Sequence, residues 1–228
     1  FQFAFSKDGQ WASIIANEFE RKADVIARGF SGYNSRQCKA LLPYLKNDFE
    51  GVSIVGVFLG ANDANDPKQN PQQAVPLKEY KGNLKSIVDY IKGFNEIRSV
   101  FLVTPPALDE EKWNNECVAK GLTSAKTAQL VGQYANACEE TAKEMGVPCI
   151  NLHTPMLQRN DWKEFLSDGL HFSAKGSEFV ASEMVPRLKD LLKREDLYEE
   201  EGIMPLWGDV DNKDPDSSFR EWMKNRQK

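Results

Sequence analysis

The chain has 228 residues, of which 41% are hydrophobic and 28% are charged, and its formal net charge is -5. The length fits one large domain with a sizeable core, and the composition is ordinary for a globular protein. The negative net charge argues against a nucleic-acid partner, which would need a basic surface. No apolar run is long enough to cross a bilayer as a helix.

The spacing of the cysteines argues against a zinc-binding protein and against a disulfide-rich protein. The cysteines are scattered, with no C-x-x-C pair. Zinc sites and dense disulfide frameworks need closer spacing. We therefore expect reduced thiols, and neither metal nor cofactor, at Cys38, Cys117, Cys138 and Cys149.

Hydrophobic spacing predicts helices along the whole chain. The predicted helices cover residues 11–19, 40–45, 80–91 and 131–145, and a last one begins after Ser173. Asp8 is placed to cap the first helix, Gly146 to end the fourth, and Pro186 to kink or restart the last.

Predicted strands lie between these helices, at residues 23–27, 52–59, 100–103 and 147–152. Residues 52–59 are almost all apolar, as a strand covered on both faces must be, so we expect this strand to be central. Strands that alternate with helices form a parallel sheet with helices on both faces. The sequence therefore predicts an α/β fold, a three-layer α/β/α sandwich.

The end of the chain differs in character. From Arg194 onward it is charged and poorly patterned, and we expect residues 195–201 to be solvated. The apolar segment 204–207 is expected to dock on the body. We predict one domain over residues 1–195 and a charged extension over residues 196–228 that docks on it.

Polar clusters follow the predicted strands at Ser31-Gly32, Asn62-Asp63, Thr104-Pro105-Pro106 and Asp168–His171. In parallel sheets the ligand site lies where the carboxyl ends of the strands meet. Asp168 and His171 can act as the orienting acid and the base of a Ser-His-Asp triad. The Gly32 amide and the Asn62 carboxamide can donate hydrogen bonds to a developing oxyanion.

Each of these residues also has a purely structural interpretation. Asp168 could simply accept hydrogen bonds from loop amides, and Gly32 could only permit a turn. Asn62-Asp63 could only close an Asx-turn. Each signal is weak by itself, and their convergence on one edge of the sheet favours the catalytic interpretation.

Three short motifs resemble the sequence blocks of a known family. Residues 30–34 (Phe-Ser-Gly-Tyr-Asn), 60–63 (Gly-Ala-Asn-Asp) and 168–171 (Asp-Gly-Leu-His) are similar to the second, third and fifth blocks of the SGNH hydrolases, also called GDSL esterases. Their order and spacing also match. The resemblance runs from Gln2 to about Leu192 and implies the flavodoxin-like fold of that family.

Segments 28–34 and 166–171 are similar almost residue for residue to the isoamyl acetate-hydrolysing esterase subfamily. The Gly-Asp-Ser motif that holds the family's nucleophile does not occur in the chain. In the subfamily it lies a few residues before a segment like residues 2–5. We therefore expect the nucleophile and the first central strand upstream of Phe1, and the chain as it stands to be inactive. Ser31 is not favoured as a substitute, because it precedes the donor glycine.

The resemblance implies a serine esterase that hydrolyses small, acetate-like esters without a cofactor. His171 would take the serine proton and pass it to the leaving alcohol, while Asp168 would hold the imidazole. Gly32 and Asn62 would bind the oxyanion. The proposed walls of the substrate pocket are Leu170, Phe172, Thr104 and Pro105.

Other functions remain open on the sequence alone. The missing motif also fits a non-catalytic binding protein with a degenerate esterase cleft. A lipase, thioesterase or carbohydrate esterase with a bulkier substrate is a further alternative. We expect His153 to be packed or at the surface, and Asp63 to brace the Asn62 loop. The expected partner is a small-molecule ester. The compartment, with the cytoplasm favoured, and the oligomeric state, with a homo-oligomer as one alternative, are left open.

Overall fold

The computed structural model describes residues 10–197 and 202–226. In chain order its elements are α1 (Trp11–Glu18), α2 (Ser35–Leu41), η2 (Leu42–Phe49), β1 (Ile54–Phe58), α3 (Leu77–Lys92), β2 (Ser99–Val103), α4 (Glu110–Ala119), α5 (Ala128–Met145), β3 (Cys149–Ile150), α6 (His153–Leu157), η3 (Trp162–Phe165), α7 (Ala174–Arg194), η4 (Trp207–Asp209) and α8 (Pro215–Arg226). The predicted mixture of helices with a parallel sheet is confirmed.

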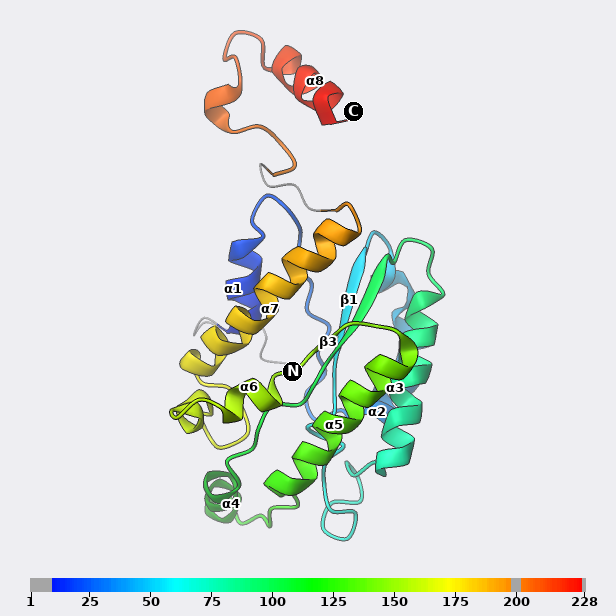
Figure 1. The fold of residues 1–228 in the computed structure, drawn as a ribbon, viewed down its shortest axis with the longest axis vertical. Helices are drawn as coiled ribbons and strands as arrows, with labels where there is room; N and C mark the ends of the chain where they lie inside the picture. The colour runs from blue at the N-terminus through cyan, green and yellow to red at the C-terminus, as the bar shows by residue number, and fades with distance from the viewer. Residues whose placement is uncertain (1–9, 198–201, 227–228) are drawn as a thin grey trace.

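The three layers of the predicted sandwich are visible in Figure 1, where α1 and α7 cover one face of the sheet and α3 and α5 the other. Within the described residues the sheet has three strands in the order β1-β2-β3, all parallel. Parallel strands end at the same edge, so the loops after β1, β2 and β3 start from one side of the molecule.

Side chains of β2 alternate between two hydrophobic cores. Val100 and Leu102 pack in the core beneath α3 and α5. Phe101 and Val103 pack in the core beneath α1 and α7. Both faces of β2 are therefore buried from Val100 to Val103, which explains the apolar run at these positions. Gly56 of β1 makes room for this packing, because a Cβ atom there would lie 2.5 Å from the Phe101 ring.

Three strand predictions need correction. Residues 23–27 form no strand and pair with none among the described residues, because a strand requires a neighbour that sequence pattern cannot supply. Residues 52–59 contain β1, but β2 holds the middle of the described sheet and only Val57 of β1 is buried. Residues 147–152 shrink to the short β3, since the chain enters α6 at His153.

Most helix boundaries follow the predicted signals. Ser173 caps α7 by accepting a hydrogen bond from a backbone amide in its first turn, at 3.1 Å. Gly146 ends α5 with φ of 61°, in the left-handed region that glycine tolerates. Asp8 lies outside the described residues, and Gln10 occupies the N-cap position of α1. The last helix does not restart at Pro186, because α7 runs through it.

Two helices lie in stretches that show no apolar periodicity. The first, α4, begins at an Asp109 cap whose carboxylate accepts a hydrogen bond from the Lys112 amide at 3.3 Å. Glu110 and Glu111 place negative charge in its first turn, which favours the amino end of a helix. The second, α8, lies in the charged end of the chain. Capping and charge, rather than an apolar face, mark the start of α4.

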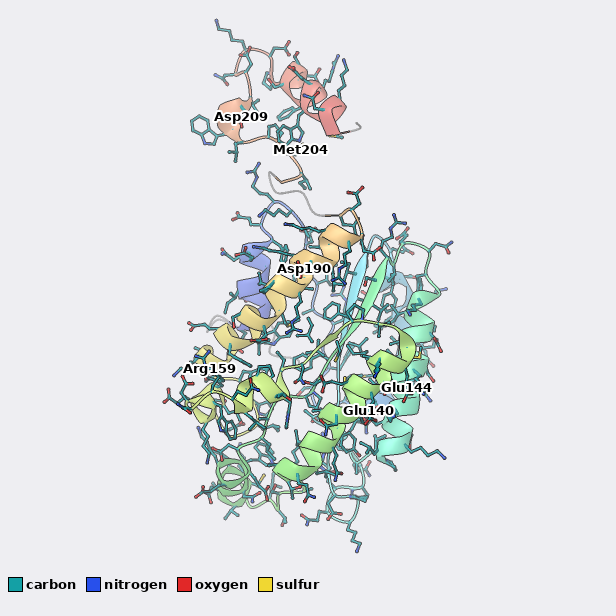
Figure 2. All side chains as sticks on the ribbon, in the orientation of Figure 1. Glu140, Glu144, Arg159, Asp190, Met204 and Asp209 are labelled. Carbon is teal, nitrogen blue, oxygen red and sulfur yellow. The ribbon has the colours of Figure 1, made fainter. Side chains whose placement is uncertain are left out.

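Exposed ion pairs join the two helices on one face of the sheet. Glu140 and Glu144, labelled in Figure 2, lie on α5 beside α3. The ammonium of Lys81 is 3.1 Å from Glu140 and 3.0 Å from Glu144, and that of Lys85 is 2.6 Å from Glu144. Exposed pairs of this kind each contribute roughly 0–1 kcal/mol, so the apolar core rather than these pairs holds the layer together.

Arg21 holds the segment that precedes η4. Its guanidinium donates to the carbonyls of Met204 and Pro205 at 2.7 and 3.0 Å, and its own carbonyl accepts from the Ile203 amide at 2.8 Å. Trp207 does not anchor this segment, because its side chain is 92% exposed. Pro205 is buried whereas Leu206 and Trp207 are exposed, so the segment is held by the hydrogen bonds of Arg21 together with the burial of Pro205. The division at residue 195 stays a prediction.

All four cysteines are free thiols. In the described part of the chain, no helix combines the length and the apolar character needed to span a membrane.

Candidate active site

Asp168 and His171 form a hydrogen-bonded pair in the loop before α7. The carboxylate Oδ2 of Asp168 lies 2.7 Å from Nδ1 of the imidazole. The other oxygen, Oδ1, accepts hydrogen bonds from the amides of Leu170 and His171 at 2.9 and 2.8 Å. Both predicted roles of Asp168, binding loop amides and orienting the imidazole, are thus served by different oxygens of the same carboxylate.

This bonding stabilises the charged form of the carboxylate. Burial alone would raise the pKa of Asp168, but the hydrogen bonds from the His171 ring and from the two amides outweigh burial. They hold the pKa of Asp168 well below its ordinary value. At neutral pH the carboxylate is therefore an acceptor only, which requires Nδ1 of His171 to carry its proton toward Asp168.

The loop around the pair is closed by short-range contacts. Leu166 and Phe172 form an isolated antiparallel bridge, and the Ser167 amide donates to the His171 carbonyl at 2.8 Å. Gly169 has φ of 94°, and a Cβ atom there would lie 2.5 Å from the Trp113 backbone nitrogen. Glycine at this position therefore lets the loop turn tightly against the start of α4.

The loop is also joined to the segment that follows β2. The Asp109 amide donates to the Gly169 carbonyl at 3.0 Å, and the Lys112 ammonium donates to the Leu166 carbonyl at 2.9 Å. The Trp113 ring packs edge-on against His171, with centroids 6.1 Å apart. The start of α4, which carries no obvious sequence signal for a site, thus forms one wall beside the imidazole.

The two predicted oxyanion donors lie on loops that are bonded to each other. The Asn62 carboxamide donates to the Tyr33 carbonyl at 2.9 Å, which uses one of its two N–H groups. Gly32 has φ of 76°, and its carbonyl accepts a hydrogen bond from the Gln73 carboxamide at 2.8 Å. Gln73 belongs to the loop that follows Asn62, so the structure brings the Gly32 and Asn62 loops together.

Asp63 also connects these two loops, through its buried carboxylate. Its side chain is fully buried, and its carboxylate oxygens lie 3.0 and 3.1 Å from the Ser35 amide at the start of α2. Burial raises the pKa of Asp63 above its ordinary value, although the hydrogen bonds of Ser35 and the charge of Lys126 oppose that rise. As expected from the sequence, Asp63 braces the Asn62 loop.

The burial and hydrogen bonds of the nearby serines indicate which of them could act as a nucleophile. Ser35 is buried, and its hydroxyl is bonded to the Asn83 carboxamide at 3.0 Å. Ser31 is exposed on the turn that contains Gly32. Ser167 and Ser173 bind backbone groups of their own loop.

The proposed pocket walls differ in what they contact. Leu170 and Phe172 are buried on either side of His171 in sequence. Pro105 packs against Gly60, where a Cβ atom would lie 3.2 Å from the proline ring. Thr104 is fully buried, and its hydroxyl accepts hydrogen bonds from the amides of residues 152 and 153 at 3.0 and 3.3 Å. The contacts that the structure gives Thr104 are therefore those of a brace between β2 and β3.

His153, the second histidine, begins α6 and packs against α5. A Cβ atom at Gly132 would lie 3.5 Å from both Cε1 and Nε2 of its ring. Burial lowers the pKa of His153, which favours the neutral ring. No cluster of three or more His, Cys, Asp or Glu side chains that could hold a metal ion occurs in the described ranges.

Lys126 is a residue of this region that the sequence pattern does not reveal. It follows α4 in the chain, its side chain is only 6% exposed, and its ammonium donates to the Ala61 carbonyl. A lone lysine in a polar loop carries no sequence signal. Its burial beside the Asn62 loop depends on a tertiary contact over 65 positions.

The chain is similar to known proteins over most of its length. Residues 3–179 match the model of the GDSL-like lipase/acylhydrolase family. The chain is 38% identical to the human isoamyl acetate-hydrolyzing esterase 1 homolog, over 96% of this chain and 87% of that protein. It is also 38% identical to a GDSL esterase/lipase of Arabidopsis thaliana, over 94% of this chain and 92% of that protein.

Solved structures share the fold at lower identity. A lipase/acylhydrolase from Enterococcus faecalis superposes with a TM-score of 0.63 at 22% identity, over 79% of this chain and 85% of that one. A carbohydrate acetylesterase family member from Sinorhizobium meliloti gives a TM-score of 0.62 at 16% identity, over 83% and 89%. The family match covers most of the chain, and the chain therefore belongs to the GDSL-like lipase/acylhydrolase family.

Proposed function

We propose that the complete protein is a serine esterase that hydrolyses small acyl esters, with His171 as its general base and Asp168 as the residue that orients it. The observation that carries the proposal is the 2.7 Å contact between Asp168 Oδ2 and His171 Nδ1, with Oδ1 held by two amides. This arrangement fixes the imidazole with Nε2 as the nitrogen that accepts a proton.

In this mechanism a serine hydroxyl attacks the carbonyl carbon of the ester. His171 Nε2 takes the hydroxyl proton as the new oxygen–carbon bond forms, and then gives it to the alcohol oxygen as the old ester bond breaks. Water attacks the acyl-serine by the same route and releases the acid. The Gly32 amide and the Asn62 carboxamide stabilise the negative oxygen of both tetrahedral intermediates. No metal or organic cofactor takes part.

The Gly-Asp-Ser motif of the family is absent from the printed sequence. In this proposal the nucleophile is the serine of a Gly-Asp-Ser motif that the printed sequence does not include, and the printed chain by itself is inactive. The buried, hydrogen-bonded hydroxyl of Ser35 argues against Ser35 as a substitute nucleophile.

The choice of a small ester is supported by the curated relatives. Their names state that they are homologues of an isoamyl acetate-hydrolyzing esterase, whose substrate is a short ester. Bulkier esters are the alternative within the same family, and a panel of p-nitrophenyl esters of increasing chain length separates the two. We expect turnover to be highest for acetate, and a preference for long acyl chains would reject the small-ester assignment.

The base assignment is tested with the two histidines of the chain. In the protein extended upstream through its Gly-Asp-Ser motif, we expect His171→Ala to lower kcat by about 1,000-fold or more for p-nitrophenyl acetate. His153→Ala is the matched control, and we expect it to stay within about threefold of wild type. Full turnover by His171→Ala would show that the base lies elsewhere.

A non-catalytic binding protein is the second candidate, because the printed sequence lacks the motif. A fluorophosphonate probe separates the two functions. The upstream-extended protein should be labelled on its motif serine, whereas the printed chain should not. If the upstream sequence contains no such serine, the binding function is favoured instead.

A further inference from the structure

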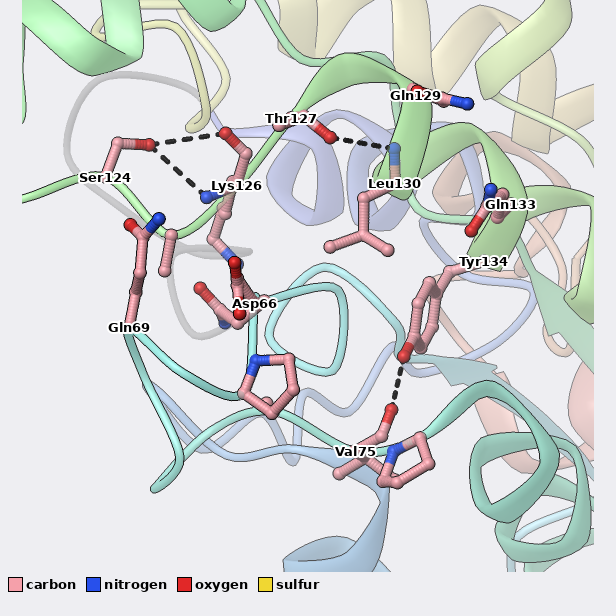
Figure 3. A pocket seen from close by; sticks show the side chains of 15 residues that line it. Asp66, Gln69, Val75, Ser124, Lys126, Thr127, Gln129, Leu130, Gln133 and Tyr134 are labelled. Carbon is pink, nitrogen blue, oxygen red and sulfur yellow. Dashed lines mark hydrogen bonds between the residues drawn. The ribbon is translucent and has the colours of Figure 1, made fainter.

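A buried cation borders a cavity next to the Asn62 loop. The cavity has a volume of about 440 Å³ and lies between residues 65–76, which follow Asn62, and residues 124–134 at the start of α5. Figure 3 shows Lys126 extending from the second segment toward the loop that carries Asp66. A buried ammonium is costly unless it is paired or hydrogen-bonded, so its contacts indicate what it does.

The Lys126 ammonium donates to the carbonyl of Ala61. This carbonyl and the Asn62 amide nitrogen belong to the same planar peptide unit, so holding one sets the orientation of the other. The next peptide unit is held as well, because the Asn65 carboxamide donates to the Asn62 carbonyl at 2.7 Å. Both peptide units of Asn62 are therefore fixed by side chains from outside its own position.

The segment that presents Lys126 is itself anchored. The Ser124 hydroxyl lies 3.3 Å from the Lys126 amide and 3.4 Å from its carbonyl, as the dashed lines in Figure 3 show. The Asp66 amide donates to the Ala125 carbonyl at 2.7 Å. Lys126 thus acts from a backbone that is bonded to the same loop, rather than from a mobile surface chain.

The charge of the Lys126 ammonium also acts on Asp63 of this loop. Asp63 is fully buried one position after Asn62, and its charge favours the protonated form of Lys126. Burial nevertheless lowers the pKa of Lys126 to about 8. The lysine therefore partly neutralises a buried carboxylate that braces the Gly32 and Asn62 loops.

We propose that Lys126 is a positioning residue for ester hydrolysis, whose buried ammonium holds the Ala61 carbonyl and balances Asp63 so that the Asn62 carboxamide is oriented toward the oxyanion. Lys126 touches no reacting atom in this inference and acts through Asn62. The inference rests on the proposed function, because the orientation of Asn62 matters to rate only if Asn62 is an oxyanion donor.

The test is a double-mutant cycle in the upstream-extended protein, with p-nitrophenyl acetate as substrate. Lys126→Met removes the charge and the donor while keeping the length of the side chain. We expect it to lower kcat about 10-fold with KM within about twofold, because only the transition state loses an interaction. Lys120→Met, at the exposed end of α4, is the matched control and should match wild type.

The decisive measurement is Lys126→Met in the Asn62→Ala background. If Lys126 acts through Asn62, it should lower kcat by less than about twofold there, since the residue that it positions is gone. The same 10-fold loss in both backgrounds would overturn the proposal. A rise in KM with unchanged kcat would also overturn it, because it would make Lys126 a substrate-binding residue of the cavity.

A stability control separates positioning from folding. Lys126→Gln, which lacks the charge but keeps a donor, is the second variant, and the cycle uses a variant that melts near the wild-type temperature. If both variants fail to fold, Lys126 is a stability residue and the proposal is wrong. The His171→Ala result is independent of this cycle, so a failed esterase assignment is distinguished from a failed role for Lys126.

Discussion

The Asp168–His171 loop and the loops that carry Gly32 and Asn62 are held in different ways. Asp168 reaches His171 three positions away, and two amides of the same loop complete its hydrogen bonds. Asn62 instead depends on Tyr33, 29 positions away, and on Lys126 through the neighbouring Ala61, 65 positions away. The proposed acid–base pair is built locally, whereas the proposed donor pair is assembled from distant parts of the chain.

This difference predicts how the two halves of the site respond to change. A substitution in the local pair should alter proton transfer and change mainly the loop that contains it, because the hydrogen bonds of the Asp168 carboxylate lie within that loop. The structural effect of a substitution in the Gly32 and Asn62 loops should extend beyond the substituted residue, because each hydrogen bond there also joins two segments. We therefore expect the geometry of the Asp168–His171 pair to tolerate substitutions elsewhere. We expect the geometry of Gly32 and Asn62 to change on substitution of residues that do not contact the substrate.

The largest expected effect tests the Asp168–His171 pair. In Asp168→Asn, the Oδ1 atom can still accept from the Leu170 and His171 amides, so the loop should keep its shape. The new NH2 group faces Nδ1 of His171 and forces the ring proton onto Nε2, which can then no longer act as a base. We expect kcat to fall by about 1,000- to 10,000-fold. Steady-state kinetics of the upstream-extended protein, alongside its melting temperature, checks this.

Asp161→Asn is the matched control for that variant. Asp161 pairs with Lys175 at 2.8 Å on the surface, and we expect its loss to change kcat by less than about twofold. Retention of most activity by Asp168→Asn would show that a different acid orients His171.

The second-largest expected effect tests the Gly32 and Asn62 loops. Asn62→Ala removes the carboxamide that we assign to the oxyanion and also its bond to Tyr33. We expect kcat to fall by about 100- to 1,000-fold, the usual loss for one oxyanion donor. Asn47→Ala, at an exposed position of η2, is the control and should be silent. An Asn62→Ala enzyme with wild-type kcat would limit Asn62 to a structural role.

The smallest effect concerns the pH dependence of stability. The pKa of Lys126 is about 8 in the folded chain, because burial disfavours its charge, against an ordinary 10.5. Between these values the unfolded chain binds more protons at this position, so folding stability rises with pH. We expect the free energy of unfolding of wild type to rise relative to Lys126→Met, by at most about 1.4 kcal/mol per pH unit.

Denaturant unfolding at pH 7, 8, 9 and 10 measures this difference. Below pH 8 both states hold the Lys126 proton, so the difference between wild type and variant should be flat. The variant is the proper reference for the titratable groups that do not interact with Lys126, because they are common to both proteins. Cys117 interacts electrostatically with Lys126, so the same difference is also measured in a Cys117→Ala background. A difference that does not change from pH 8 to 10 would show that Lys126 keeps an ordinary pKa.

The parts of the fold that were predicted correctly are those with local signals. The apolar spacing in α3 and α5, the serine cap of α7 and the glycine that ends α5 each act within a few residues. Residues 23–27 show the limit, because an extended apolar segment becomes a strand only when a neighbour binds its backbone. The helix α4 was missed because its apolar face is weak and its start depends on capping.

The sequence by itself determined the family, the layered α/β fold and the Asp168–His171 pair, because short motifs and local hydrogen bonds encode them. Only the tertiary structure decided how Gly32 and Asn62 are held, and that Asp63 and Lys126 hold them. The physical reason is burial. The charges of Lys126 and Asp63 act strongly on their neighbours because distant segments of the chain exclude water from them. Nothing in the residues adjacent to Lys126 specifies which carbonyl it will bind.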